Sequence, residues 1–116
     1  MWYRCPYKLR SGKRQDKLKE PARVDRFKAL MLANQWDFAG QGKSFAYWRQ
    51  GNVVWISEGH HRANAALEIG RESGDWSYLH LLLEHGRWEP ELPPPPDCCL
   101  FPTRRRRSSL LIWLGW

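Results

Sequence analysis

Apolar residues first recur at helical spacing after Glu20 and Pro21. They occupy positions i, i+3, i+6 and i+7 of one helix face: Val24, Phe27, Leu30 and Met31. Proline suits the first position of a helix, and an acidic residue beside it suits the helix dipole. We therefore predict a helix that opens at Pro21 and ends near Asn34.

Two runs rich in aromatic and β-branched residues follow, at residues 45–48 and 53–56. Between them, residues 49–52 contain glycine and asparagine, which favour a tight turn. The pattern predicts a β-hairpin, preceded by a loop over residues 36–42. Near the start of the chain, residues 7–9 are suited to a short first strand.

Two more helices are predicted, at residues 60–69 and 76–85. The first carries small or apolar residues that would pack closely on a sheet: Ala63, Ala66, Leu67 and Gly70. Gly70 suits the position just after a helix. The second places leucines on one face, at positions 79, 82 and 83, and stops at Gly86. A buried strand is the alternative for this second segment.

Chain length and element order indicate one domain. A chain of 116 residues has the size of a single domain, and strands interspersed with helices predict an α+β fold. We assign this domain to residues 1–90. Residues 91–116 contain the proline run 93–96, which cannot join a packed helix. We expect them to form a linker and a basic, tryptophan-rich tail that docks through apolar residues: Leu111, Trp113 and Trp116.

The charge of the chain is strongly positive and clustered. The formal net charge of +7 and the isoelectric point near 9.7 favour polyanionic partners such as nucleic acid or nucleotides. Basic residues gather near the start of the chain and again at residues 104–107; the first group is Arg4, Lys8, Arg10, Lys13, Arg14, Lys17 and Lys19. Two solvated basic segments explain this pattern equally well.

The cysteines and the hydropathy of the chain indicate in which compartment we expect the protein. The chain has 3 cysteines, of which Cys98 and Cys99 are adjacent, a spacing that strains a disulfide, and no C-x-x-C pair occurs. We therefore expect free thiols in a reducing compartment. No secretory signal and no run of about 18 apolar residues is visible. These features predict a cytoplasmic location without a membrane span.

The stretch most informative for function is Glu58, Gly59, His60, His61 and Arg62, between the second hairpin strand and the alanine-rich helix. A helix start binds anions through its backbone N–H groups and its partial positive charge. Arg62 suits bidentate phosphate binding, and the histidines suit proton transfer near neutral pH. Glu58 can bind a metal ion or accept a proton. The plainer alternative is an ordinary strand-to-helix turn with solvated polar neighbours.

The E-G-H-H-R motif at residues 58–62, followed by A-A-L at residues 65–67, resembles the helix-opening motif of the ParB/sulfiredoxin-like superfamily. The resemblance covers roughly residues 7–83. It is closest to ParB-like nuclease domains, the C-terminal toxins of bacterial polymorphic secreted proteins, which often end in a tryptophan-rich tail like residues 112–116. It implies a small domain with a short mixed β-sheet and packed helices. It also implies a toxin carried on a longer chain into the cytoplasm of a target cell.

The branches of this superfamily differ at the motif. Sulfiredoxins have a cysteine where this chain has His60, which argues against reduction of a sulfinic acid. Chromosome-partitioning ParB proteins carry G-E-R-R there and bind CTP, so the two histidines argue against a CTP clamp. Free-serine kinases carry D-G-H-H-R, and their catalytic acid and second histidine match Glu58 and His61. Their further catalytic acid lies nearer the N-terminus, where Asp16 and Glu20 are the candidates.

The resemblance implies a role for each motif residue. Arg62 and the backbone of Gly59, His60 and His61 would hold a phosphate or nucleotide. His61, with His60 as second choice, would transfer a proton, and Glu58 would act as a base or bind a metal. The implied cofactors are ATP or another nucleotide and Mg²⁺, and the implied partners are nucleic acid or a nucleotide and a cognate immunity protein. Two alternatives stay open: a non-catalytic nucleotide- or DNA-binding module, and an ATP-dependent phosphotransferase related to free-serine kinases.

Overall fold

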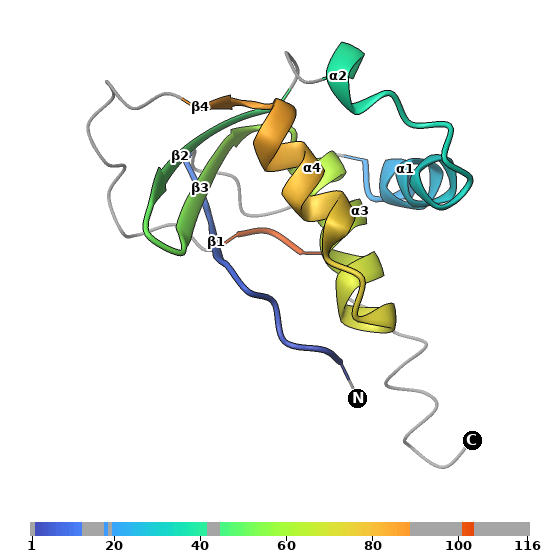
Figure 1. The fold of residues 1–116 in the computed structure, drawn as a ribbon, viewed down its shortest axis with the longest axis horizontal. Coiled ribbons are helices and arrows are strands. Elements are labelled where there is room, and N and C mark those ends of the chain that lie inside the picture. The colour runs from blue at the N-terminus through green and yellow to red at the C-terminus, as the bar shows by residue number, and fades with distance from the viewer. Residues whose placement is uncertain (1, 13–17, 19, 42–44, 89–100, 104–116) are drawn as a thin grey trace.

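A computed structural model describes residues 2–12, 18, 20–41, 45–88 and 101–103 of the chain (Figure 1). In these residues, helices pack on one mixed β-sheet, so the predicted α+β class is confirmed. The prediction of a domain boundary near residue 90 stays untested, because residues 89–100 lie outside the described residues. So do Asp16, the adjacent cysteines and the tail residues predicted to dock.

The sheet has 4 strands in the order β1-β3-β2-β4. Their bounds are Lys8–Ser11 for β1, Ala46–Gln50 for β2, Val53–Glu58 for β3 and Arg87–Trp88 for β4. The strands β2 and β3 form the predicted antiparallel hairpin, whereas β1 runs parallel to β3 and β4 runs parallel to β2. Because β1 runs parallel to β3, both strands end at the same edge of the sheet.

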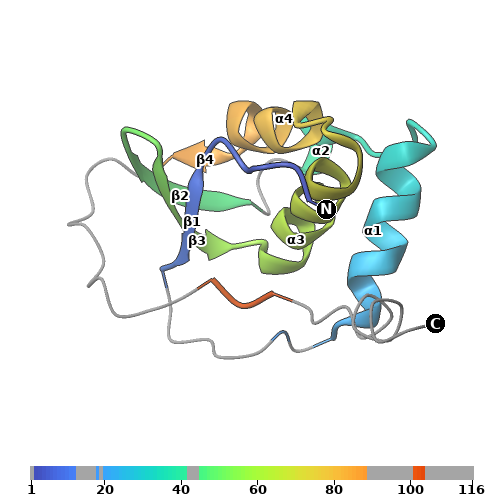
Figure 2. The same cartoon turned by 90° about the horizontal axis from the view of Figure 1, so that it is seen from below.

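The helices are α1 (Ala22–Leu32), α2 (Phe38–Gln41), α3 (His60–Ser73) and α4 (Ser77–His85). Figure 2 shows α3 between the sheet and α1. The core lies where α3 meets these two layers, and its fully buried side chains include Val24, Met31, Phe45, Val54, Ile56 and Leu79. The alanines predicted to pack closely are buried as expected, with Ala63 and Ala66 both at 0% exposure. Their small size lets α3 approach its neighbours closely.

An ion-pair bridge joins α1 to α3. The Lys28 ammonium lies 3.1 Å from a Glu68 carboxylate oxygen and 3.0 Å from Glu72. The Lys28 and Glu68 side chains are only 14% and 8% exposed, so water screens this pair weakly. The bridge thus holds α1 on α3 with a specific alignment along the two helix axes.

Two local predictions differ from the structure. The segment predicted as a loop at residues 36–42 contains the short helix α2, which begins where Asp37 Oδ1 accepts a hydrogen bond from the Gly40 N–H at 3.0 Å. The hairpin turn is shorter than predicted, because Arg49 and Gln50 still pair with β3. A third prediction is confirmed: the segment at residues 76–85 contains a helix, α4, rather than the alternative strand.

The end of α3 also differs from the prediction. Gly70 lies inside the helix, and the helix ends at Gly74, whose φ of 81° is left-handed. A Cβ on Gly70 would overlap the ring of Trp76, so this glycine serves close packing rather than helix termination. Sequence spacing alone does not distinguish the two glycines, because both suit a helix end.

None of the helices in the described residues has the length and apolar character needed to cross a membrane. A short segment near the end of the chain, residues 101–103, packs on the domain. Pro102 is buried, and Phe101 lies partly buried against the core. This segment brings a distant part of the sequence to the start of α3.

Candidate functional site

The motif at residues 58–62 lies where the parallel strands β1 and β3 end. Ser11, the last residue of β1, pairs with Ile56 of β3, and the Gly12 N–H donates to the Ile56 carbonyl at 2.7 Å. Gly59 then turns the chain from β3 into α3 with a φ of 94° and a ψ of 34°. A side chain at that left-handed position would strain the backbone, which explains why glycine stands there.

His60 is the buried centre of the site. Its side chain is 5% exposed, and its Nε2 lies 2.9 Å from the Ser11 hydroxyl oxygen, a bond that joins residues 49 positions apart. The Phe101 ring stacks on the other side, with ring centroids 5.8 Å apart and planes inclined by 18°. A buried imidazole needs a hydrogen-bond partner to offset its lost hydration, and Ser11 provides one. His60 is therefore held in one orientation.

Asn64 supports this arrangement from the next turn of α3. Its Nδ2 donates to the His60 carbonyl at 2.8 Å and to the Pro102 carbonyl at 2.9 Å. Asn64 is 1% exposed, and in the described part of the structure its Oδ1 has no hydrogen-bond partner. Asn64 thus ties the segment at residues 101–103 to the start of α3.

His61 points toward the start of α1 instead. Its Nε2 accepts a hydrogen bond from the Glu20 backbone N–H at 3.1 Å. A nitrogen that accepts cannot carry a proton, so this geometry requires an unprotonated Nε2. The contact places Glu20, one of the two acids predicted to assist catalysis, beside the motif. The Glu20 carboxylate itself is exposed and lies 3.8 Å from Arg23 Nε, a weak surface pair.

Arg62 is half-buried against aromatic rings. Its guanidinium carbon lies 5.3 Å from the centroid of the Phe27 ring and 5.7 Å from that of Trp36. Its Nε is buried and has no hydrogen-bond partner in the described part of the structure. Burial lowers the pKa of Arg62 below its ordinary value, the charge of Arg23 lowers it further, and Glu58 raises it. The guanidinium is therefore poorly hydrated and would gain from an anion.

Glu58 ends β3, where it is exposed and lies opposite Ala46 of β2. Its effect on the pKa of Arg62 shows that its charge acts on that guanidinium. No group of three His, Cys, Asp or Glu side chains within the described ranges is arranged to hold a metal ion.

The structure thus separates the side chains of the motif at residues 58–62. Consecutive helix residues point about 100° apart, so His60 faces Ser11, His61 faces the start of α1, and Arg62 lies over the aromatic rings. What they share is the first turn of α3, at the positive end of its dipole.

The sequence did not indicate three residues of the site: Ser11, Asn64 and Phe101. Ser11 follows a predicted strand, and its role depends on the parallel pairing of β1 with β3. Asn64 lies one turn after His60 on the same helix, which is a weak but usable signal. No pattern in the sequence connects Phe101 to His60.

Comparison of the chain with protein-family models, curated proteins and solved structures found no significant match. The resemblance to the ParB/sulfiredoxin-like superfamily therefore depends on the motif and on the order of elements around it.

Proposed function

We propose that this chain is a ParB/sulfiredoxin-like domain that binds phosphate groups at the start of α3 and acts, as a bacterial effector toxin, on nucleic acid or a nucleotide. The observation that carries the proposal is the buried hydrogen bond between Ser11 and His60, at the shared end of β1 and β3. Ligands of sheets with parallel strands bind beyond the carboxyl ends of those strands. This hydrogen bond holds the first residue of α3 against β1, and the same helix turn carries His61 and Arg62.

Each group has a separate part in the proposed reaction. The first turn of α3 and the guanidinium of Arg62 stabilise the negative charge of a phosphate. Glu58 would hold Mg²⁺ together with phosphate oxygens, since Mg²⁺ usually binds one or two carboxylates and the substrate's phosphates. That ion would neutralise charge on the reacting phosphate.

Proton transfer is assigned to His61. His60 is too deeply buried to meet a large substrate, whereas His61 is partly exposed at the helix start. We therefore assign a positioning role to His60, because its hydrogen bond to Ser11 fixes the start of α3 on β1. We assign the contact with the substrate to His61. The basic residues of the N-terminal segment would attract a polyanion to this edge of the sheet.

Matched histidine variants test this assignment. We expect the wild-type chain to slow bacterial growth when expressed in the cytoplasm, and the purified protein to cleave RNA, DNA, ATP or CTP in the presence of Mg²⁺. His61→Ala should lower turnover by about 10²- to 10⁴-fold and relieve toxicity. His85→Ala, an exposed histidine on α4, serves as the control and should change neither. Full toxicity and turnover in a folded His61→Ala protein would overturn the role of His61.

A phosphotransferase related to free-serine kinases is a second candidate, favoured by the contact between Glu20 and His61. This reading requires an acid near the motif, contributed from the N-terminal side, and Glu20 has that position. ATP turnover with and without added L-serine separates the candidates. Formation of ADP that depends on serine and is lost in Glu20→Gln would favour the kinase over the toxin.

A non-catalytic nucleotide- or DNA-binding module is the third candidate, and the enclosure of His60 by Ser11 and Phe101 favours it. It predicts that ATP or CTP raises the melting temperature without turnover or toxicity. If the chain is a toxin, a cognate immunity protein would relieve toxicity when the two are expressed together.

A further inference from the structure

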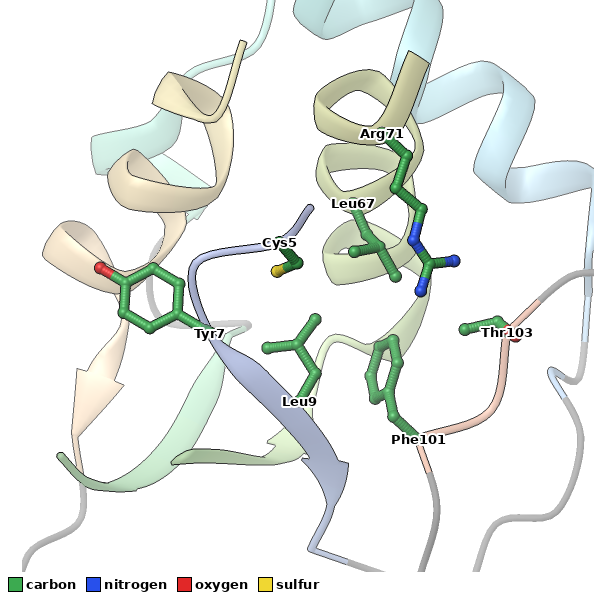
Figure 3. A pocket seen from close by; sticks show the side chains of 7 residues that line it. All are labelled: Cys5, Tyr7, Leu9, Leu67, Arg71, Phe101 and Thr103. Carbon is green, nitrogen blue, oxygen red and sulfur yellow. The ribbon is translucent and has the colours of Figure 1, made fainter. Parts of the chain in front are cut away.

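A pocket of ≈ 290 Å³ lies between the N-terminal segment and the C-terminal half of α3, apart from the motif (Figure 3). Leu9, Leu67 and Phe101 give it apolar lining. Tyr7 also borders it, but Figure 3 shows the Tyr7 ring turned toward α4, where its hydroxyl lies 2.9 Å from His80 Nδ1. The volume is at the lower end of the range for small-molecule sites, about 300–1,000 Å³.

Among the described residues that line this pocket, one carries a positive charge. Arg71 of α3 turns its guanidinium toward Thr103 at the pocket (Figure 3). The guanidinium carbon lies 4.8 Å from the centroid of the Trp2 ring, and no carboxylate pairs with Arg71 in the described ranges. An arginine that stacks on an aromatic ring but lacks a carboxylate keeps its donors for an anionic ligand.

The thiol of Cys5, which also lines the pocket, does not cancel that charge. Burial raises the pKa of the Cys5 thiol above its ordinary value, although a backbone hydrogen bond at Tyr7 and the charge of Arg71 act in the opposite direction. Cys5 is therefore a neutral thiol near neutral pH, and the pocket keeps a net positive charge. In the described lining, apolar side chains thus lie beside one cationic group.

We propose that this pocket binds a small organic anion. Its apolar body, aromatic or short aliphatic, would lie against Leu9, Leu67 and Phe101, and its carboxylate or phosphate would accept hydrogen bonds from Arg71. Phe101 also stacks on His60, so such a ligand would contact the residue that encloses the motif. The site is separate from the phosphate site, since it contains none of the residues 58–62.

Alkylation of Cys5 reports on this pocket directly. In a Cys98→Ser/Cys99→Ser background, Cys5 is the remaining cysteine. The probes are benzoate and phenyl phosphate, with benzyl alcohol as a neutral control and inorganic phosphate as an anion without an apolar body. At ten times its Kd, benzoate or phenyl phosphate should slow alkylation by iodoacetamide about tenfold by mass action. The two controls at the same concentration should slow it by less than about twofold.

Variants of Arg71 complete the test. Arg71→Gln should weaken benzoate binding about tenfold or more, because a charge-assisted hydrogen bond is lost. Arg71→Lys keeps the positive charge and should bind benzoate with an affinity between those of the wild type and Arg71→Gln. This result would show that the loss in Arg71→Gln comes from the missing charge and not from misfolding. Arg26→Gln, an exposed arginine on α1, is the matched control and should bind normally.

Three outcomes would overturn the proposal: equal protection by all four compounds, protection by none, or unchanged binding in Arg71→Gln. None of these results depends on toxicity or turnover, so failure here leaves the proposed function untouched.

Discussion

Both ends of helix α3 have a glycine with a left-handed φ, but the surroundings of the two glycines differ. Gly59 precedes the helix with a φ of 94°, and Gly74 follows it with a φ of 81°. At the start, buried polar side chains form hydrogen bonds to β1 and to residues 101–103. At the end, Gly70 and Gly74 approach the rings of Trp76 and Tyr3. A left-handed glycine therefore stands at each end of the helix. The segments packed around each glycine determine whether buried polar side chains or aromatic rings lie beside it.

The largest effect should come from filling the close contact at the structural end. Gly70→Ala places a methyl group in the ring of Trp76. Overpacking of this kind costs about 1–3 kcal/mol, and the better helix propensity of alanine recovers up to about 1 kcal/mol. Because the overlap with the ring is deep, the overpacking cost belongs at the upper end of its range, and we expect the free energy of unfolding to fall by about 2 kcal/mol in urea denaturation. Binding of ATP by the protein that remains folded should be unchanged. An unchanged midpoint would show that Trp76 moves aside easily.

A smaller loss of stability, but a loss of function, should follow Gly59→Ala. Holding alanine at a left-handed φ costs about 1–2 kcal/mol. The new side chain also disturbs the first turn of α3, where the proposed phosphate site lies. Thermal melts with and without ATP should therefore show a lower melting temperature and a smaller stabilisation by ATP. Gly74→Ala is the matched control, because it carries similar strain and should keep the full ATP effect. An equal ATP effect in both variants would remove the distinction between the two ends.

The smallest effect concerns the turn between α3 and α4. Asp75 Oδ1 accepts hydrogen bonds from the Ser77 N–H at 3.0 Å and the Ser77 hydroxyl at 2.6 Å, and these bonds lower the pKa of Asp75. Since the folded pKa lies below the unfolded value of about 3.9, this contribution is present at neutral pH and is lost as pH falls through the folded pKa. Asp75→Ala should destabilise the protein by about 0.5–1 kcal/mol at pH 7. Urea denaturation at several pH values should show the difference from wild type shrinking below about pH 4. A difference that stays constant with pH would assign the effect to the backbone conformation of the turn rather than to the Asp75 carboxylate.

Local patterns in the sequence predicted most of the fold. The apolar face that contains Val24 and Met31 indicated α1, and turn residues indicated the hairpin of β2 and β3. These predictions succeed because helical periodicity and turn chemistry involve neighbouring residues. The short helix α2 was missed, because its start depends on one side-chain hydrogen bond, from Gly40 N–H to Asp37, rather than on any periodic pattern.

The candidate site was predicted only in part. The motif at residues 58–62 was found because all its members are consecutive. Their consecutive positions did not indicate the partners of each side chain, since side chains on one helical turn diverge, and His60 and His61 have different partners. The pocket beside Arg71 could not be predicted at all, because its walls come from three segments far apart in the chain.

The sequence by itself determined where α1, α3, α4 and the hairpin lie, the glycine turn at residue 59 and the set of polar groups that follow it. These are local properties of the chain. The tertiary structure alone decided that β1 runs beside β3, that Ser11 meets His60 and that Phe101 covers the imidazole. It also decided that Gly74 rather than Gly70 ends α3, through the position of Trp76. Such choices depend on which distant segments pack together, and no local pattern records that packing.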